Sequence, residues 1–184
     1  YTPYQAEVSQ GRLEVLLSFQ QMICDLTGME LANASLLDEA TAGAEAMSMC
    51  RRLSKAKSNV FFVDDRVHPQ TLAVIKTRAG FMGFEILVGN PDKELARREC
   101  FGVLLQYPAS TGGLHDLSDV ISLAHEKKAL AVVAADILET AKRVQAQSPG
   151  RGLPEILLEM GIDQEGIQRT VARHSGLSFE TVKA

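Results

Sequence analysis

Four polar residues stand where chemistry with a ring-shaped, phosphorylated ligand would need them: Ser35, Glu39, His68 and Asp136. Ser35 and Glu39 flank the start of an alanine-rich stretch, whose small residues would let the backbone approach a phosphate closely. His68 follows a β-branched run and could stack its flat ring on an aromatic ligand. Asp136 closes a later run, from which a carboxylate could reach a ring nitrogen. Together these groups predict a ligand site.

The same residues also have structural interpretations. Asp38 and Glu39 could simply cap a buried helix and lie at the positive end of its dipole, and two carboxylates would repel a phosphate. A lone histidine in a loop is often a structural residue. An aspartate at the end of a buried strand, such as Asp136, is a common helix cap. What favours the ligand site is the order of Glu39, His68 and Asp136 along the chain.

A pyridoxal-phosphate enzyme built on a parallel sheet needs one more group. Besides amides for the phosphate, a flat group over the ring and a carboxylate on the pyridine nitrogen, it needs a lysine for the Schiff base. In this architecture the lysine lies a few tens of residues beyond the aspartate. Lys142 is too close to Asp136, and Lys183 lies in a predicted helical tail. Without that amine we do not expect a self-sufficient pyridoxal-phosphate enzyme.

The elements that must position these residues alternate between strand and helix patterns. Helices are predicted over 11–27, beginning after Ser9 and ending at Gly28, and over 37–53, with a short strand between them at 29–34. Further strands are predicted at 59–63, 84–88, 101–105 and 130–135, and further helices at 68–79, 91–98 and 117–127. This alternation predicts an α/β fold with a mainly parallel sheet of about five strands, flanked by helices on both faces. Ligand-binding residues of such sheets gather at the carboxyl ends of the strands.

The C-terminal part of the chain differs in composition from the rest. We expect an α/β domain over 1–140, a linker over 141–151 that is rich in polar and turn-forming residues, and a small helical appendage over 152–184. The pattern Gly152-Leu-Pro-Glu-Ile-Leu-Leu-Glu-Met-Gly161 faintly resembles the N-terminal helical module of type II secretion and pilus ATPases.

Composition argues against several classes of function. The net charge of −4 offers no basic excess for binding nucleic acid. No apolar run approaches the roughly 20 residues that span a bilayer, and no charged-then-apolar leader opens the chain. The three cysteines lack a Cys-x-x-Cys spacing and are expected to be buried or inert thiols in a reducing compartment. We therefore expect a cytoplasmic protein without a membrane, nucleic-acid or metal partner.

Six short motifs carry a resemblance to a known family. They are Tyr1-Thr-Pro-Tyr4, Ser9-Gln-Gly-Arg12, Ala34-Ser-Leu-Leu-Asp-Glu39, His68-Pro-Gln-Thr71, Gln106-Tyr-Pro108 and Ala134-Ala-Asp136. Together they resemble the N-terminal half of glycine decarboxylase, the pyridoxal-phosphate P-protein of the glycine cleavage system. The resemblance ends near residue 140 and implies a partial large domain of a fold-type I pyridoxal-phosphate enzyme.

The resemblance also implies an activity and partners. Glycine dehydrogenase (decarboxylating) is an oxidoreductase that decarboxylates glycine and passes the aminomethyl group to a lipoyl carrier protein. P-proteins resemble two homologous halves, of which the C-terminal half carries the lysine, and some bacteria split the halves into two subunits. The chain is therefore expected to be a fragment or subunit, inactive alone, that joins a C-terminal P-protein half in an oligomer. Pyridoxal phosphate is expected in the complete enzyme, with none bound covalently to this chain.

Particular residues acquire roles through the same resemblance. It implies that Tyr1 and Tyr4 face the substrate in the active site of the other half. It also implies that Ser35, Glu39, His68 and Asp136 surround a vestigial cofactor pocket, with no catalytic residue in this chain. The missing lysine equally favours an alternative function, a non-catalytic protein–protein interaction module that acts through the helical tail.

Overall fold

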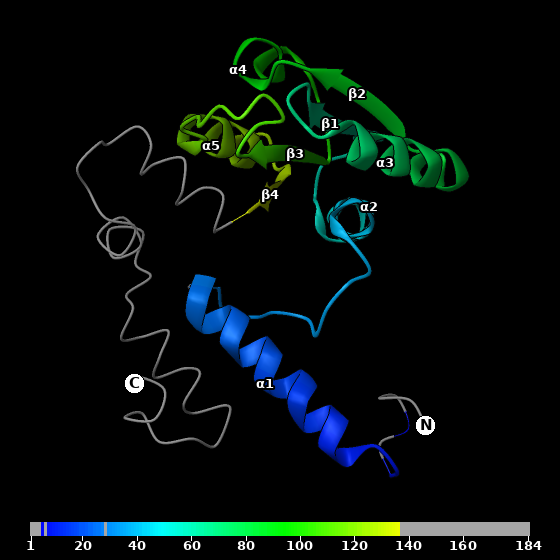
Figure 1. The fold of residues 1–184 in the computed structure, drawn as a ribbon. Helices are drawn as coiled ribbons and strands as arrows, with labels where there is room; N and C mark the ends of the chain where they lie inside the picture. The colour runs from blue at the N-terminus through cyan, green and yellow to red at the C-terminus, as the bar shows by residue number, and fades with distance from the viewer. Residues whose placement is uncertain (1–4, 6, 28, 137–184) are drawn as a thin grey trace, which may run out of the picture. The chain divides into compact units, whose positions relative to one another are not determined.

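The computed structural model describes residues 5, 7–27 and 29–136 of the 184-residue chain (Figure 1). These residues belong to two compact units, the first reaching Leu36 and the second beginning at Leu37. The predicted linker over 141–151 and the helical appendage over 152–184 lie outside the described residues.

The described part of the first unit contains helix α1 (Gln10–Thr27), which confirms the predicted N-terminal helix. The strand predicted at 29–34 is wrong, because this segment has irregular backbone and its Met29 and Leu31 are exposed. A short apolar run becomes a strand only where a neighbouring strand pairs with its backbone. Here the carbonyl of Ala32 instead accepts a hydrogen bond of 2.6 Å from the side chain of Gln20.

The second unit contains a four-stranded, fully parallel sheet in the order β2-β1-β3-β4. The strands are β1 (Val60–Asp64), β2 (Glu85–Gly89), β3 (Gly102–Tyr107) and β4 (Leu130–Ala135). Each lies within two residues of its predicted range. The described sheet has four strands rather than about five because 29–34 does not form one.

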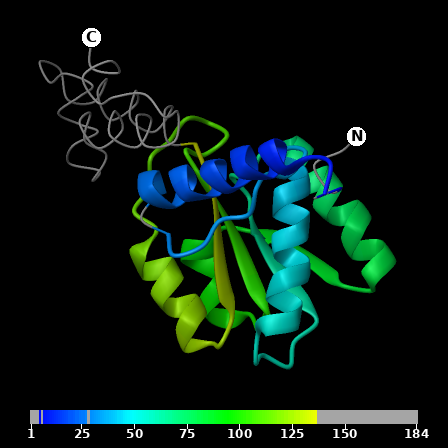
Figure 2. The same ribbon diagram turned by 90° about the horizontal axis from the view of Figure 1, so that it is seen from below.

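Helices cover both faces of this sheet, as the α/β pattern predicts (Figure 2). One face packs against α2 (Glu39–Leu53) and α3 (Pro69–Met82). The other packs against the 3-10 helix η1 (Leu95–Arg97), which follows the short α4 (Pro91–Glu94), and against α5 (Ser118–Glu126). The predicted α/β fold is therefore confirmed.

The two cores follow from the alternation of side chains along the central strands. In β1, Phe61 and Val63 pack toward α2 and α3, whereas Phe62 packs toward η1 and α5. Phe61 stacks on Phe101 with ring centres 5.4 Å apart. Helix α2 approaches closely at Gly102, where an added Cβ would lie 2.9 Å from the Cβ of Cys50. Burial of these apolar side chains removes them from water and is the main favourable contribution to folding.

The buried cysteines agree with the prediction of inert thiols. Cys50 and Cys100 are buried free thiols, and Cys24 is half-buried. Burial raises the pKa of Cys50 to about 11 and that of Cys100 to about 11. A thiol with so high a pKa stays protonated at neutral pH and is a poor nucleophile.

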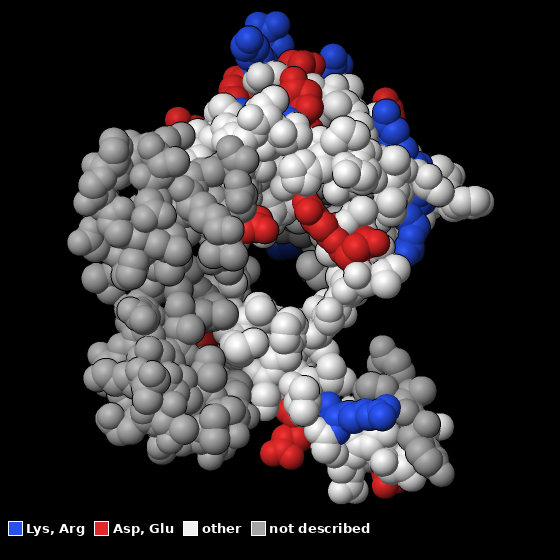
Figure 3. Space-filling model, in the orientation of Figure 1, with Lys and Arg blue, Asp and Glu red and all other residues white. Residues whose placement is uncertain are grey.

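The surface near α4 carries charges of both signs. Acidic Asp92 and Glu94 flank Lys93 in this helix, and Figure 3 shows acidic and basic side chains next to each other at this end of the second unit. None of the described helices is long and apolar enough to cross a membrane.

Candidate functional site

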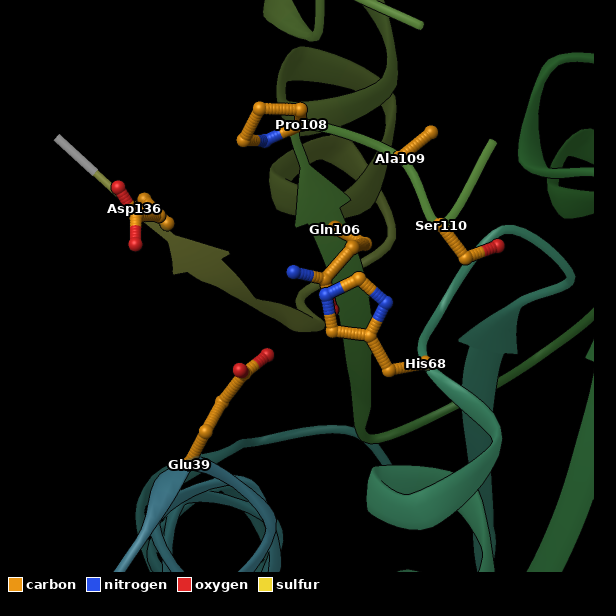
Figure 4. A pocket seen from close by; sticks show the side chains of 8 residues that line it. Glu39, His68, Gln106, Pro108, Ala109, Ser110 and Asp136 are labelled. Atoms are coloured by element: carbon orange, nitrogen blue, oxygen red, sulfur yellow. The ribbon is translucent and has the colours of Figure 1, made fainter. Parts of the chain in front are cut away.

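A cavity of about 420 Å³ lies at the carboxyl ends of β3 and β4 (Figure 4). It is lined by Glu39, His68, Gln106, Pro108, Ala109, Ser110, Ala135 and Asp136. Parallel strands end at the same edge of a sheet, so residues that follow them converge there. Three of the four residues predicted for a ligand pocket, Glu39, His68 and Asp136, therefore line one cavity.

The start of α2 brings Glu39 to the cavity. The preceding Asp38 is the N-cap, and its Oδ1 accepts a 2.6 Å hydrogen bond from the backbone N–H of Thr41. This backbone hydrogen bond, reinforced by the Thr41 side chain, lowers the pKa of Asp38. Asp38 thus acts as a helix cap, while Glu39 extends its carboxylate into the space between Asp136 and His68 (Figure 4).

The start of α3 brings His68 to the opposite side of the cavity. His68 is the N-cap of α3 and Pro69 is its first residue, where the missing N–H costs nothing. The imidazole makes no capping hydrogen bond. Its ring lies near the end of β3 and faces the same space as the Glu39 carboxylate (Figure 4).

A buried ion pair holds the loop that carries His68. Asp64 is 1% exposed, and its Oδ1 accepts 2.9 Å and 2.8 Å hydrogen bonds from the backbone N–H and the Nε of Arg66. A longer contact of 3.4 Å joins Arg66 to Asp92. The carbonyl of Arg66 also accepts a 2.9 Å hydrogen bond from the N–H of Ser110. This arrangement ties the loop after β1 to the loop after β3, which form two walls of the cavity.

The ion pair changes the ionisation of neighbouring groups. The hydrogen bond to Asp64 is the largest cause of the raised pKa of Arg66. Asp65 has its pKa raised, chiefly by desolvation and then by the negative charge of Asp64. The positive charge of Arg66 therefore compensates the Asp64 carboxylate. For Asp65, desolvation and the nearby charge of Asp64 disfavour the ionised form.

The end of β3 contributes a residue that sequence reasoning missed as part of the lining. Gln106 is 4% exposed, and its Nε2 donates a 3.2 Å hydrogen bond to the carbonyl of Ala134. Its Oε1 is buried and has no hydrogen-bond partner in the described part of the chain. A glutamine inside an otherwise apolar strand was the available signal, because buried amides normally have partners for both of their ends.

Asp136 lines the cavity, whereas Ser35 is not among its lining residues. Asp136 follows β4 directly, and its N–H donates a 3.1 Å hydrogen bond to the carbonyl of Tyr107, which continues the ladder between the strands. Ser35 belongs to the first unit, where its exposed hydroxyl donates to the carbonyl of Leu36 at 3.1 Å. Tyr1 and Tyr4 lie outside the described residues. Among those described, no group of three acidic, histidine or cysteine side chains is placed to hold a metal ion.

The parallel sheet with helices on both faces has the large-domain architecture of fold-type I pyridoxal-phosphate enzymes. The model of the glycine cleavage system P-protein family matches residues 1–151, and the chain belongs to this family. The predicted resemblance is thereby confirmed.

Individual relatives agree with this assignment. The chain is 64% identical over 138 residues to a glycine dehydrogenase (decarboxylating) of Aliivibrio fischeri and 66% identical over 138 residues to one of Colwellia psychrerythraea. Each alignment covers 75% of this chain and 14% of the relative. The crystal structure of a glycine decarboxylase (P-protein) in inhibitor-bound form superposes with a TM-score of 0.65 at 37% identity, covering 77% of this chain and 33% of that one. The chain thus spans about one seventh of the curated relatives' length.

The family's cofactor gives a further test of the cavity. His68 and Asp136 are the residue types that would stack on a pyridine ring and bind its nitrogen. However, no lysine or arginine is among the described residues that line the cavity, and Glu39 occupies the helix start where a phosphate would bind. A carboxylate there repels a phosphate dianion. The described lining therefore does not fit pyridoxal phosphate.

Proposed function

We propose that this chain is an N-terminal part of a glycine dehydrogenase (decarboxylating). The complete enzyme would decarboxylate glycine with pyridoxal phosphate and pass the aminomethyl group to a lipoyl carrier protein. The observation that carries this proposal is the identity of 64% and 66% over 138 residues to two proteins of that name.

The proposed role of this chain is structural support for a site completed elsewhere. The lysine would come from a C-terminal P-protein half or subunit, because the cavity described here lacks one. The second unit would act as scaffold, and Tyr1 and Tyr4 would form part of the wall of the partner's active site. Association with that half in a cytoplasmic oligomer follows from the same proposal.

A chimaera tests the proposal directly. The segment of the Aliivibrio fischeri enzyme that aligns with this chain is replaced by the corresponding 138 residues, and glycine-dependent exchange of labelled carbon dioxide is measured. We expect the chimaera to retain exchange activity, because the two segments are 64% identical over 138 residues. An inactive chimaera that folds and binds pyridoxal phosphate normally would contradict the proposal.

The isolated chain provides the complementary measurement. After addition of pyridoxal phosphate and reduction with borohydride, mass spectrometry is expected to find no adduct on one specific lysine. The chain alone should also give no carbon dioxide exchange. A stoichiometric adduct at a single lysine would show that this chain supplies its own Schiff base, and the division of roles proposed above would be wrong.

A further inference from the structure

A second cavity lies where β4 begins, at the opposite end of the strands from the cavity described above. Its volume is about 280 Å³. Its lining comes from residues 53–55 at the end of α2 and from His125, Lys128, Ala129 and Leu130, between the end of α5 and the start of β4. Figure 2 shows α2 and α5 ending at the edge of the sheet where β4 begins. We name it the lysine cavity after Lys55 and Lys128.

A hydrogen bond joins the two segments that line the lysine cavity. The hydroxyl of Ser54 donates to the carbonyl of Lys128 at 2.9 Å, and its oxygen accepts a 3.0 Å hydrogen bond from the N–H of Ala56. The loop after α2 is thereby tied to the turn after α5, 74 positions further along the chain. Because Lys55 follows Ser54 directly, the backbone beneath both lysines is fixed before any ligand arrives.

The backbone of Lys128 gives a reason to look for a role of its side chain. Its φ of 63° lies in the left-handed region, which favours glycine. The N–H of Lys128 donates to the carbonyl of His125 at 2.9 Å. The N–H of Ala129 donates to the carbonyl of Ala124 at 2.9 Å, and together these bonds end α5. A glycine would make the same backbone hydrogen bonds with less strain, so the strained lysine points to a function for its side chain.

The lining of the lysine cavity combines hydrogen-bond donors with an apolar surface. Lys55 and Lys128 are exposed, and each ammonium offers three donors and a positive charge. The exposed imidazole of His125 offers at least one N–H in either protonation state. Leu53, which is 64% exposed, and Leu130 add apolar surface beside these donors. A ligand that uses the whole lining carries negative charge next to an apolar group.

The neighbouring charges show which lysines are available to a ligand. Lys127 forms an ion pair with Glu99 at 3.1 Å and is not among the residues that line the cavity. Glu126 is exposed at the last position of α5 and also lies outside the described lining. No ion pair between described residues uses Lys55 or Lys128. Lys127 therefore has a structural partner, whereas the two lysines of the cavity present their charge to it.

We propose that the lysine cavity binds a small phosphate monoester that carries an apolar group. Two ammonium groups match the phosphate, which is largely a dianion at neutral pH, better than a singly charged carboxylate. His125 adds an N–H donor, and the exposed Leu53 packs against the organic group. The proposal does not depend on the function proposed above, because this site and the cavity at the carboxyl ends of β3 and β4 share no residue.

Titration with phenyl phosphate tests the proposal. The 184-residue chain, labelled with carbon-13 in its histidine rings and leucine methyl groups, is followed by NMR at constant pH and low salt. We expect saturable shifts of the His125 ring and the Leu53 methyl groups, an unchanged His68 ring, and weaker binding as salt is added. Phenol, which lacks the phosphate, should not bind. Shifts of His68 in place of His125, or equal shifts with phenol, would overturn the proposal.

Two further probes test the class of ligand. Inorganic phosphate presents the same oxygens without the ring, so it should bind roughly tenfold more weakly than phenyl phosphate because Leu53 stays uncovered. Equal affinity would assign the cavity to the free ion and overturn the assignment of an ester. Benzoate keeps the ring but carries one negative charge, so it should also bind more weakly than phenyl phosphate. Tighter binding of benzoate would overturn the preference for phosphate.

Variants test the contribution of the two lysines. Lys55→Gln and Lys128→Gln should each weaken the binding of phenyl phosphate roughly tenfold, as expected for the loss of a hydrogen bond between charged groups. Lys76→Gln removes the same charge from an exposed position on α3 outside the cavity and should leave the affinity unchanged. Equal affinities of these three variants would contradict the assigned site.

Lys128→Gly separates a binding role from a structural one. Glycine relieves the strain at positive φ, so the melting temperature should rise while the affinity for phenyl phosphate falls roughly tenfold. A lysine that serves only to stabilise the end of α5 gives the reverse result, a lower melting temperature with unchanged affinity. That reverse result would overturn the proposal.

Discussion

Two carboxylates at the same edge of the sheet lie in opposite environments. Asp64 ends β1, is buried and is bound on its Oδ1 by two N–H groups of Arg66. Asp136 follows β4, is exposed and lines a cavity whose described lining residues include no arginine or lysine. Both occupy the strand-end position at which ligand sites form. Arg66, two positions after Asp64, binds the Asp64 carboxylate and makes that strand end a structural support, whereas the end of β4 borders a cavity.

Of the changes predicted below, replacement of Arg66 should have the largest effect on stability, because it removes the ion pair that distinguishes the two strand ends. Arg66→Met leaves the buried carboxylate of Asp64 without its charge partner and should lower the free energy of unfolding by about 3–5 kcal/mol. Urea denaturation followed by circular dichroism measures the change. A loss below about 1 kcal/mol would mean that water or movement compensates Asp64.

Two control variants separate charge from packing. Arg78→Met removes an exposed partner of Glu45 and should change the free energy of unfolding by no more than about 1 kcal/mol. The double variant Asp64→Asn with Arg66→Met removes the uncompensated charge and should recover a large part of the stability lost in the single variant. An additive result for the double variant would show that the charge of Asp64 is not the cause of the loss.

The pH dependence of stability should sharpen the comparison between the two strand ends. Asp38 and Asp65, which lie near the cavity, should contribute with opposite signs, and each effect should be smaller than that of removing Arg66. The pKa of Asp38 is lowered by its helix-cap hydrogen bonds, so its contribution is present above its usual pKa of 3.8 and is lost as pH falls through the lowered value. The pKa of Asp65 is raised, chiefly by desolvation, so its protonated form is favoured by folding and that contribution is lost as pH rises through the raised value.

Asparagine variants isolate each contribution. Asp38→Asn retains a capping oxygen but cannot ionise, so its melting temperature should fall below that of the unmodified chain at neutral pH and approach it in acid. Asp65→Asn should raise the melting temperature at neutral pH, and the gain should disappear below pH 3.8. Calorimetric scans across the acid range measure both. Differences of the same sign for the two variants would contradict the assigned causes.

The smallest effect on stability is expected in the cavity itself. Glu39 is exposed at the first position of α2, and no hydrogen bond described above for the second unit depends on its carboxylate. Glu39→Gln should therefore change the free energy of unfolding by less than about 0.5 kcal/mol. Urea denaturation checks this, with Arg66→Met as the sensitive reference. A loss as large as that of Arg66→Met would show that Glu39 is a structural residue. The cavity would then differ less from the ion pair at the end of β1.

The amino-acid sequence predicts local elements well because their signals are local. The pattern at 130–135 matches β4, and Pro69 after His68 marks the start of α3. The run at 29–34 was predicted wrongly because a strand depends on a partner, which no local pattern supplies. The convergence of Glu39, His68 and Asp136 could be expected, because parallel strands end at the same edge of the sheet. The lack of a described hydrogen-bond partner for Gln106 Oε1 could not be expected from the sequence. That oxygen depends on where the neighbouring carbonyl of Ala134 lies in three dimensions.

The glycine that begins β3 has a consequence far from its own position. Helix α2 runs from Glu39 at the cavity to the turn that carries Cys50, and Gly102 leaves room for the Cys50 side chain. At 1.5 Å per residue, about 16 Å of nearly rigid helix separates the two ends. Any side chain introduced at Gly102 would displace the Cys50 turn, and the stiff helix would pass that displacement to Glu39. A substitution at position 102 would thus move a residue of the cavity lining from about 16 Å away, and a search for such substitutions restricted to the lining would overlook it.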